Sequence, residues 1–320
     1  MLGDPPCILH ASAQVRPRRR FRLAAAGAAS YLPSPLWRRR PVGPNPLATL
    51  PLAAEPTPPR APRLAVFTLV LVAVSGGALL FLAGLPSPWA EWRPATCMPS
   101  GCFCELPRPS AVRQPVNALS SLGFLLVASA VLVGAARAAR SRSNAMSASP
   151  VYSRLYAAAL VAIGLGSALF HASLTFVGQT ADVMGMYLLG TFLVLYSWGR
   201  LRPLDPRGAA GWYVAANAVL VTLLVFAPAL RRYAFAAIVV CALALELLVR
   251  RRHRVQARAS LLGGAVIASL LGFGLWILDI TGRWCDPGSV WQGHAAWHLC
   301  GAAAAASMFA YYLSEGPARS

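Results

Sequence analysis

Long apolar runs alternate with short polar segments along most of the chain. A helix that crosses a bilayer needs roughly 20 mostly apolar residues, and eight runs reach about that length, at residues 64–85, 116–136, 155–175, 180–198, 210–229, 233–249, 260–280 and 291–313. Proline and glycine in the intervening segments, such as GLPSPW, RPLDPRG and CDPGS, end helices. The pattern therefore predicts an all-α polytopic membrane protein.

The composition agrees with that class. Of the 320 residues, 57% are hydrophobic and only 12% are charged, which leaves too little polar surface for a soluble globule of this size. The net charge is +19 and every basic residue is arginine. The arginines fall in short clusters between the apolar runs, so we expect a lipid bilayer as the partner and no nucleic acid.

The distribution of arginine also predicts an orientation, because cytoplasmic loops carry the excess of basic residues. If all eight runs span the membrane, the segments on one side carry 23 arginines and those on the other side carry 6. We therefore expect both termini in the cytoplasm. The loops at 86–115 and 281–290 are then non-cytoplasmic.

Residues 1–63 form a tail rich in arginine, proline and alanine, with no apolar run long enough to span a membrane. This composition is typical of a disordered segment. A targeting segment, or coding upstream of the true start, has a similar composition, and both interpretations stay open. Because the run at 64–85 is longer than the apolar part of a signal peptide, and no clear cleavage site follows it, we expect an uncleaved first helix.

Four of the seven cysteines lie in the two loops assigned to the non-cytoplasmic side, namely Cys97, Cys102, Cys104 and Cys285. That side permits disulfides, but the sequence does not determine which cysteines pair. Cys7, Cys241 and Cys300 lie in the tail or in predicted helices. We expect these three to be unpaired thiols.

Six ionisable side chains lie within predicted spans, where each is costly unless it is paired or faces a cavity. They are His171, Asp182, Glu246, Asp279, His294 and His298. Glu246 precedes Arg250 by four residues at the cytoplasmic end of its run, so an i,i+4 ion pair and snorkelling would account for it. The other five lie in the non-cytoplasmic halves of their runs and could form one site. Asp279 could instead cap a helix or pair with Arg283.

The spacing of these residues indicates a metal site. Ser167 and His171 are four residues apart, as are His294 and His298 in HAAWH, so each pair lies on one face of its helix. Asp182 follows on the next run at a similar height. Three imidazoles from two helices, with an open position, are the ligand set of a catalytic zinc, and a nearby carboxylate could take a proton from bound water. A single membrane histidine is more often a packing residue, so the pair carries more weight.

The segments QPVNALSS, SALFH with Asp182, WILDITGRWCDP and HAAWH resemble the alkaline ceramidase family in this order. That family belongs to a seven-helix hydrolase superfamily with the adiponectin-receptor-like proteins and the lipid-remodelling enzymes of GPI anchors. The matching segments lie within residues 104–298. The resemblance implies a seven-helix hydrolase core at 116–313, so the transmembrane helix at 64–85 is an addition to it. The cysteine-containing loop at 86–115 precedes the core, and the distribution of arginine makes residues 314–320 a cytoplasmic tail.

The resemblance also implies the chemistry of the site. It implies that zinc is held by His171, His294 and His298. Asp182 would act as general base on the zinc-bound water, and Ser167 would donate a hydrogen bond to the developing oxyanion. Family members hydrolyse the amide of a sphingoid base and release a fatty acid, so the expected substrate is ceramide or a ceramide-like lipid.

Two further expectations concern the loop before the core. The resemblance implies a disulfide between Cys104 and Cys285. Eukaryotic ceramidases carry an acidic, calcium-binding segment here, whereas this chain keeps only Glu105 and has Gln114 where a glutamate is expected. Calcium needs several hard oxygen ligands, so these departures argue against a calcium site.

Three alternatives remain open. Zinc hydroxide also attacks esters, so a lipid esterase or phospholipase of the same superfamily fits the same residues. A receptor-like protein could keep the zinc without turnover. A haem or metal transporter could use the helical histidines, although Asp182 has no evident purpose beside a haem.

Overall fold

The computed structural model describes residues 60–98, 101–139, 141, 143–253 and 256–316, and its regular elements there are all helices. The long helices are α1 (Arg60–Leu82), α3 (Gly123–Ala138), α5 (Pro150–Ser173), α6 (Phe176–Leu201), α7 (Pro206–Phe226), α8 (Arg231–His253), α9 (Ala259–Ile280) and α10 (Gly293–Leu313). The short elements are α2 (Pro115–Ser120), α4 (Ala145–Ala148) and the 3-10 turn η3 (Pro228–Leu230). Cys7 and nearly all of the tail predicted at 1–63 lie outside the described residues.

The prediction of an all-α polytopic membrane protein is confirmed. Seven segments of the described chain are long and apolar enough to cross a membrane, namely α1, α2 with α3, α5, α6, α7, η3 with α8, and α9. Helix α10 has 21 residues and packs along α9 and α3, although it falls outside that apolar set. The segments from α2 to α10 form the seven-helix core, and α1 is the additional helix.

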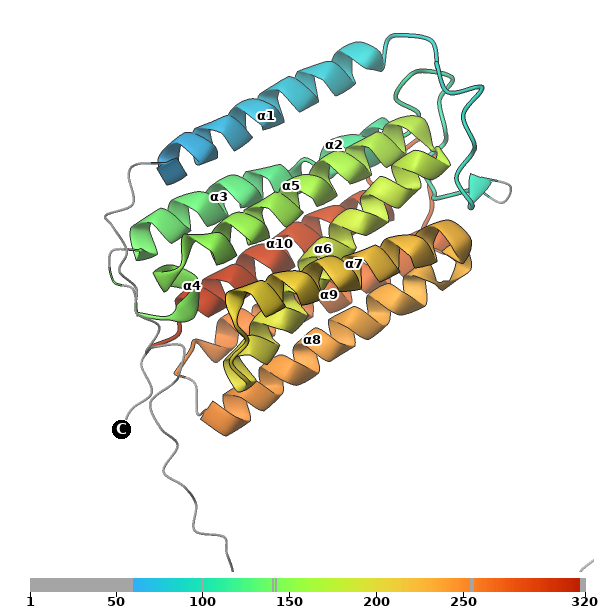
Figure 1. The fold of residues 1–320 in the computed structure, drawn as a ribbon. Helices are drawn as coiled ribbons and strands as arrows, with labels where there is room; N and C mark the ends of the chain where they lie inside the picture. Colours follow the sequence, from blue (N-terminus) through green and yellow to red (C-terminus); the bar gives the residue numbers. More distant parts are fainter. Residues whose placement is uncertain (1–59, 99–100, 140, 142, 254–255, 317–320) are drawn as a thin grey trace, which may run out of the picture. The chain divides into compact units, whose positions relative to one another are not determined.

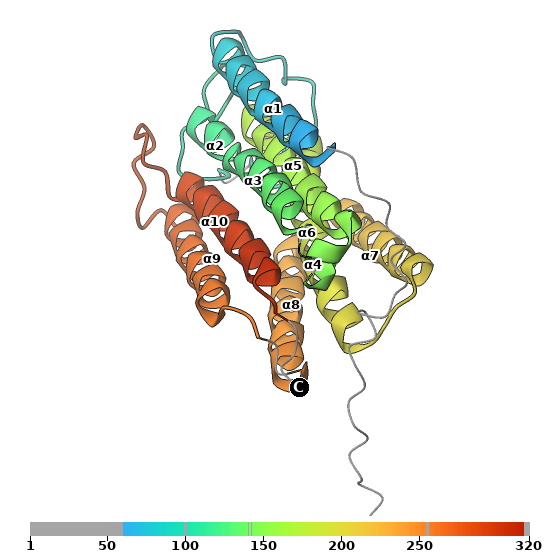
Figure 2. The ribbon, with the colours of Figure 1, turned by 90° about the vertical axis from the view of Figure 1, so that its left-hand side faces the viewer.

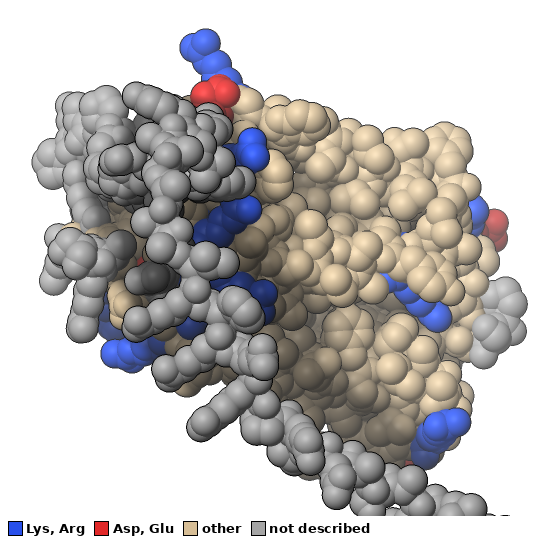
Figure 3. Space-filling model, turned by 90° about the horizontal axis from the view of Figure 1, so that it is seen from below, with Lys and Arg blue, Asp and Glu red and all other residues tan. Residues whose placement is uncertain are grey.

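The helices of the core run alongside one another with their loops at the two ends (Figure 1). Helix α3 packs against α5 and α10, α5 against α6, and α9 against α10, while α7 and α8 pack on α6. Helix α1 lies outside α3 (Figure 2). Large apolar side chains are exposed on α1, α7 and α9, including Phe81, Val214 and Leu270. Figure 3 shows a broad band of uncharged residues between charged groups near the two ends of one face, as expected for a surface in contact with acyl chains.

Two glycines bring α5 and α6 unusually close together. A Cβ atom on Gly166 would lie 2.6 Å from the carbonyl oxygen of Ala181, and one on Gly185 would lie 2.7 Å from the backbone of Ile163. Both distances are shorter than any side chain allows, so only glycine permits this approach. The contact holds the start of α6, including Asp182, directly against α5.

The turn between α5 and α6 is shorter than predicted, because α6 begins at Phe176, within the predicted linker. Leu174 takes a left-handed conformation with φ of 53°, and the side-chain oxygen of Thr175 accepts a hydrogen bond from the backbone N–H of Gly178 at 3.1 Å. Because Thr175 caps α6 in this way, FVGQT forms the first turn of that helix. The predicted linker at 176–179 is therefore helical.

The second predicted run is divided into α2 and α3. At the break, the hydroxyl of Ser121 donates to the carbonyl oxygen of Ala118 at 2.6 Å, and the N–H of Leu122 bonds three residues back, to Leu119. A serine hydroxyl that bonds nearby backbone competes with the regular helical pattern. The break separates the short helix α2 from α3.

The expected ion pair between Glu246 and Arg250 is wrong. Glu246 is fully buried and pairs with Arg200 on α6 at 2.7 Å, and it also accepts hydrogen bonds from Tyr311 at 2.7 Å and Ser197 at 3.0 Å. Arg250 instead donates to the hydroxyl of Tyr311 at 3.2 Å. The carboxylate therefore joins α6, α8 and α10 and does not snorkel to the surface.

Candidate metal centre

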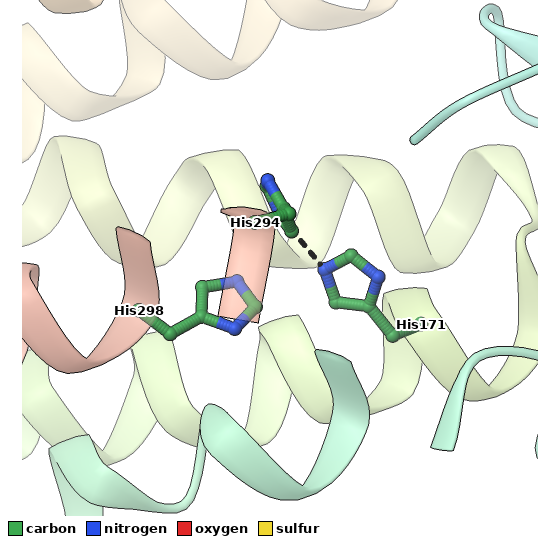
Figure 4. A group of neighbouring side chains, drawn as sticks. All are labelled: His171, His294 and His298. Atoms are coloured by element: carbon green, nitrogen blue, oxygen red, sulfur yellow. Dashed lines mark hydrogen bonds between the residues drawn. The ribbon is translucent and has the colours of Figure 1, made fainter. Parts of the chain in front are cut away.

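Three histidines that are far apart in the sequence meet inside the bundle. His171 comes from the end of α5, and His294 and His298 come from the first two turns of α10. Each is at most 4% exposed, and one ring nitrogen from each lies within 4.8 Å of the others. The Nε2 atoms of His171 and His294 are 3.1 Å apart (Figure 4). The spacing that predicted a shared site is consistent with this cluster.

The orientation of His171 is determined by Gln114. The Nδ1 atom of His171 lies 2.9 Å from the side-chain oxygen of Gln114, and the amide nitrogen of Gln114 donates to the carbonyl oxygen of Glu105 at 2.8 Å. Because the amide nitrogen of Gln114 is used on Glu105, its amide oxygen faces His171. An oxygen can only accept, so Nδ1 of His171 carries the proton. The Nε2 atom of His171 is therefore left with a free lone pair that faces the other histidines.

The orientation of His298 is determined in the same way by Ser120. The hydroxyl of Ser120 donates to the carbonyl oxygen of Asn117 at 2.9 Å and lies 2.8 Å from Nδ1 of His298. Because the single hydroxyl proton is used on Asn117, the serine oxygen accepts the proton of Nδ1. The Nε2 atom of His298 is therefore also unprotonated.

Ser167 connects the histidines to the predicted carboxylate. Its hydroxyl lies 3.1 Å from Nε2 of His298, and the carboxylate of Asp182 on α6 is close enough to Ser167 to interact with it. Ser167 is fully buried, one turn before His171 on α5. The three histidines therefore form one cluster that Ser167 contacts, and Asp182 lies next to Ser167 on the neighbouring helix.

Asp279 lies beside the histidine cluster and has a structural role there. One carboxylate oxygen accepts the N–H of His294 at 2.9 Å, and the other accepts the N–H of Cys104 at 3.0 Å. Asp279 thus caps the start of α10, where a negative charge is favourable. The sequence left two roles open for Asp279, a helix cap and an ion pair with Arg283. In the structure it is a helix cap, because its hydrogen-bond partners are backbone amides.

The loop before α2 covers the histidines. Disulfides join Cys97 to Cys102 and Cys104 to Cys285, the second being the pair that the resemblance implies. Between Cys102 and Cys104, the ring of Phe103 stacks on His294 with centroids 3.7 Å apart. The cluster is therefore closed by an aromatic ring held between two disulfide-bonded cysteines. Cys241 and Cys300 are unpaired, as expected.

Glu105 organises the other end of the same loop. Its two carboxylate oxygens accept the N–H groups of Val116 and Asn117, each at 2.8 Å, at the start of α2. Burial raises the pKa of Glu105 although these two donors favour the charged form. The carboxylate therefore fixes α2, which carries Ser120, next to Gln114.

The donor set suits zinc better than calcium or magnesium. Imidazole nitrogens bind zinc at about 2.1 Å, whereas calcium and magnesium take oxygen ligands. With Nδ1 protonated on both His171 and His298, the Nε2 lone pairs of these two rings are available to a cation in the buried space beside His294.

Sequence reasoning assigned no role to Gln114 in this site, nor to Ser120, although both lie in the segment QPVNALSS. The available signal was the polar triplet at residues 114, 117 and 120, which places three polar side chains along one side of a short helix. Nothing in that spacing shows that two of them face histidines from other helices.

A comparison with protein families gives one match. The family model described as Ceramidase matches residues 110–314, which is more than half of the chain and includes every residue of the histidine cluster. The search of curated proteins found no match to this sequence.

Proposed function

This chain belongs to the ceramidase family, and we propose that it is a zinc-dependent membrane hydrolase that cleaves the amide bond of ceramide or a ceramide-like lipid. The products would be a sphingoid base and a fatty acid. The observation that carries the proposal is the meeting of His171, His294 and His298 beside Ser167 and Asp182.

In this proposal the three histidines hold the metal through ring nitrogens. A zinc ion held there would supply an activated water and a positive charge that polarises the substrate carbonyl. The second ring nitrogens of His171 and His298 keep the ligands in the required tautomer through Gln114 and Ser120.

The protein residues would carry the proton transfers. Asp182 takes a proton from the attacking water while the water oxygen bonds to the amide carbon. Ser167, which can donate from its buried position on α5, stabilises the negative charge that develops on the carbonyl oxygen. When the carbon–nitrogen bond breaks, Asp182 returns the proton to the leaving amine, so the residue ends in its starting state.

The surroundings support zinc over calcium as the metal. Both oxygens of Glu105 are occupied by backbone amides of α2, and the side-chain oxygen of Gln114 is occupied by His171. Each of these oxygens already accepts a hydrogen bond, and these two side chains supply far fewer than the about six to eight oxygen ligands that calcium takes.

We place the metal centre near the non-cytoplasmic face, with the C-terminus in the cytoplasm, from the excess of arginine. The test is labelling of intact cells by a thiol reagent that does not cross membranes, after Cys7, Cys241 and Cys300 have been replaced. A single cysteine at exposed Val290 should react from outside, and one at Ser141 should react only after permeabilisation. The reverse labelling would contradict this orientation.

The decisive experiment combines metal analysis with turnover. Purified protein should contain about one zinc per chain, and His294→Ala and His298→Ala should each lose it. Asp182→Asn should keep the metal and lose turnover of ceramide by a factor of about 10² or more. The control Asp205→Asn changes an exposed carboxylate that caps α7, and it should leave both quantities unchanged.

The same assay separates the alternatives. Purified protein is given a ceramide and a phospholipid with the same acyl chain, and the released lipids are identified. Release of lysolipid without sphingoid base would assign an esterase and overturn the amidase proposal. Bound zinc without turnover of either lipid would favour a receptor-like role.

A further inference from the structure

A partly polar pocket lies at the same end of the bundle as the histidines. It has a volume of about 310 Å³ and is lined by residues of the 83–114 loop and of the turn between α5 and α6. The residues that matter for its chemistry are Trp89, Trp92, Arg108, Arg113, Ser173 and Thr175. None of them belongs to the metal centre.

The two guanidinium groups of this pocket have no ion-pair partner. In the part of the chain that the structure describes, the side-chain ion pairs are those of Arg200 with Glu246 and Glu315. Glu105 attracts Arg108 from a distance, but its two oxygens already accept backbone hydrogen bonds from α2. Arg108 and Arg113 therefore bring two positive charges to one cavity without a carboxylate to neutralise them.

The remaining wall is aromatic and rigid. The indole N–H of Trp89 donates to the carbonyl oxygen of Ala111 at 2.8 Å, and the ring packs edge-on against Trp92 with centroids 5.5 Å apart. Ser173 and Thr175 are buried, and their hydroxyl oxygens lie 2.9 Å apart. The pocket thus offers fixed hydroxyls and an indole surface beside two cations.

The position of the pocket indicates what could reach it. It lies where α5 ends and α6 begins, and tryptophan and arginine at the ends of membrane helices lie at the level of lipid headgroups. Such residues commonly anchor a helix individually. Here two tryptophans and two arginines line one pocket, so a single ligand can contact all four residues.

We propose that this pocket binds the phosphate-bearing headgroup of an anionic membrane lipid. Arginine binds phosphate through paired N–H donors, the buried hydroxyls can add hydrogen bonds, and the indoles match the interfacial depth of a headgroup. The lipid would be a resident of the surrounding bilayer and not the substrate of the hydrolase.

The pocket is connected to the metal centre through the backbone. The N–H of Arg113 donates to the carbonyl oxygen of Ala172 at 3.0 Å, and the N–H of the next residue, Gln114, donates to that of His171 at 2.9 Å. A lipid held by Arg113 would therefore be adjacent to the glutamine that orients His171.

The test measures lipid binding directly. Delipidated protein in detergent is mixed with phosphatidylglycerol or with phosphatidylcholine of the same acyl chains, and bound lipid is counted by native mass spectrometry. Wild-type protein should prefer phosphatidylglycerol. Because each arginine near a bilayer surface contributes roughly fivefold to the binding of an anionic lipid, the double variant Arg108→Gln with Arg113→Gln should lose about 25-fold in affinity.

A control removes one positive charge elsewhere at this end of the molecule. Arg283→Gln changes an exposed arginine that does not line the pocket, and it should keep the preference. Retained zinc in the double variant would show that it is folded. An unchanged preference in that variant would overturn the proposal.

Soluble glycerol phosphate distinguishes the source of the phosphate. If the pocket is a lipid site, millimolar glycerol phosphate should displace little phosphatidylglycerol. Efficient displacement, with equal retention of the two lipids, would assign a free phosphate ligand and overturn the lipid proposal. The measurement involves no turnover, so its outcome is separate from that of the hydrolase assay.

Discussion

The side-chain oxygen of Gln114 lies 2.9 Å from Nδ1 of His171, while the amide nitrogen of the same glutamine donates to the carbonyl oxygen of Glu105. A residue outside the histidine cluster therefore decides which nitrogen of His171 faces the cluster. Groups that orient metal-binding histidines in this way strongly affect metal affinity.

Replacing Gln114 should weaken zinc binding. Gln114→Leu removes the acceptor of the Nδ1 proton, and we expect zinc affinity to fall by about 10- to 100-fold, as measured by competition with a chelator. Gln179→Leu is the control, because Gln179 is equally buried but accepts its hydrogen bonds from Thr96. Equal affinities in the two variants would contradict the orienting role.

Ser120 should have a similar effect through His298. Ser120→Ala removes the acceptor for Nδ1, so the imidazole can take the other tautomer, and we expect roughly tenfold weaker zinc binding. The neighbouring Ser121 offers a close control, because its hydroxyl bonds to the backbone of Ala118 and contacts no histidine ring. If Ser121→Ala lowered the affinity as much, the effect would be a general disturbance of α2.

The buried ion pair at the opposite end should be important for stability. Glu246→Ala leaves Arg200 with Glu315 as its remaining ion-pair partner. Removing one partner of an isolated buried pair costs about 3–5 kcal/mol, and because Arg200 keeps Glu315 we expect a loss at or below the lower end of that range. We expect a clear drop in the thermal unfolding temperature of the protein in detergent. The exposed Glu91 provides the control, because Glu91→Ala should shift that temperature very little. A small shift of the unfolding temperature in both variants would mean that Glu246 contributes little to the stability of the fold.

The stability of the C-terminal end should depend on pH through Glu315. Burial raises the pKa of Glu315 from its ordinary value of 4.5 to about 7, against the opposing effect of Arg200. A carboxyl whose folded pKa is raised stabilises the fold while it is protonated, so this contribution is complete below about pH 4.5 and is lost as the pH rises through 7. It amounts to at most about 3 kcal/mol.

Thermal unfolding between pH 5 and pH 8 tests this dependence. Wild-type protein should lose stability over that range, as expected from the raised pKa of Glu315. Glu315→Gln, which stays neutral throughout, should lose less. Parallel curves for the two proteins would rule out Glu315 as the titrating group.

Much of the architecture follows from the sequence alone. The length and apolar character of each run depend only on neighbouring residues, so the helices could be located although their ends could not. The turn at Leu174 and Thr175 shows the limit, because an apolar count does not detect a threonine cap. The i,i+4 pair of His294 and His298 was equally readable, since helix geometry places both on one face.

Contacts between distant segments were decided only by the tertiary structure. Glu246 has Arg250 one turn away in sequence and yet pairs with Arg200, because burial favours the partner that packing brings within 2.7 Å. For the same reason, the ring nitrogens of His171 and His298 are oriented by Gln114 and Ser120 from another helix. The sequence determined which helices form and which polar groups they carry, since both depend on local composition. The packing determined which of those groups meet, since that depends on residues far apart in the chain.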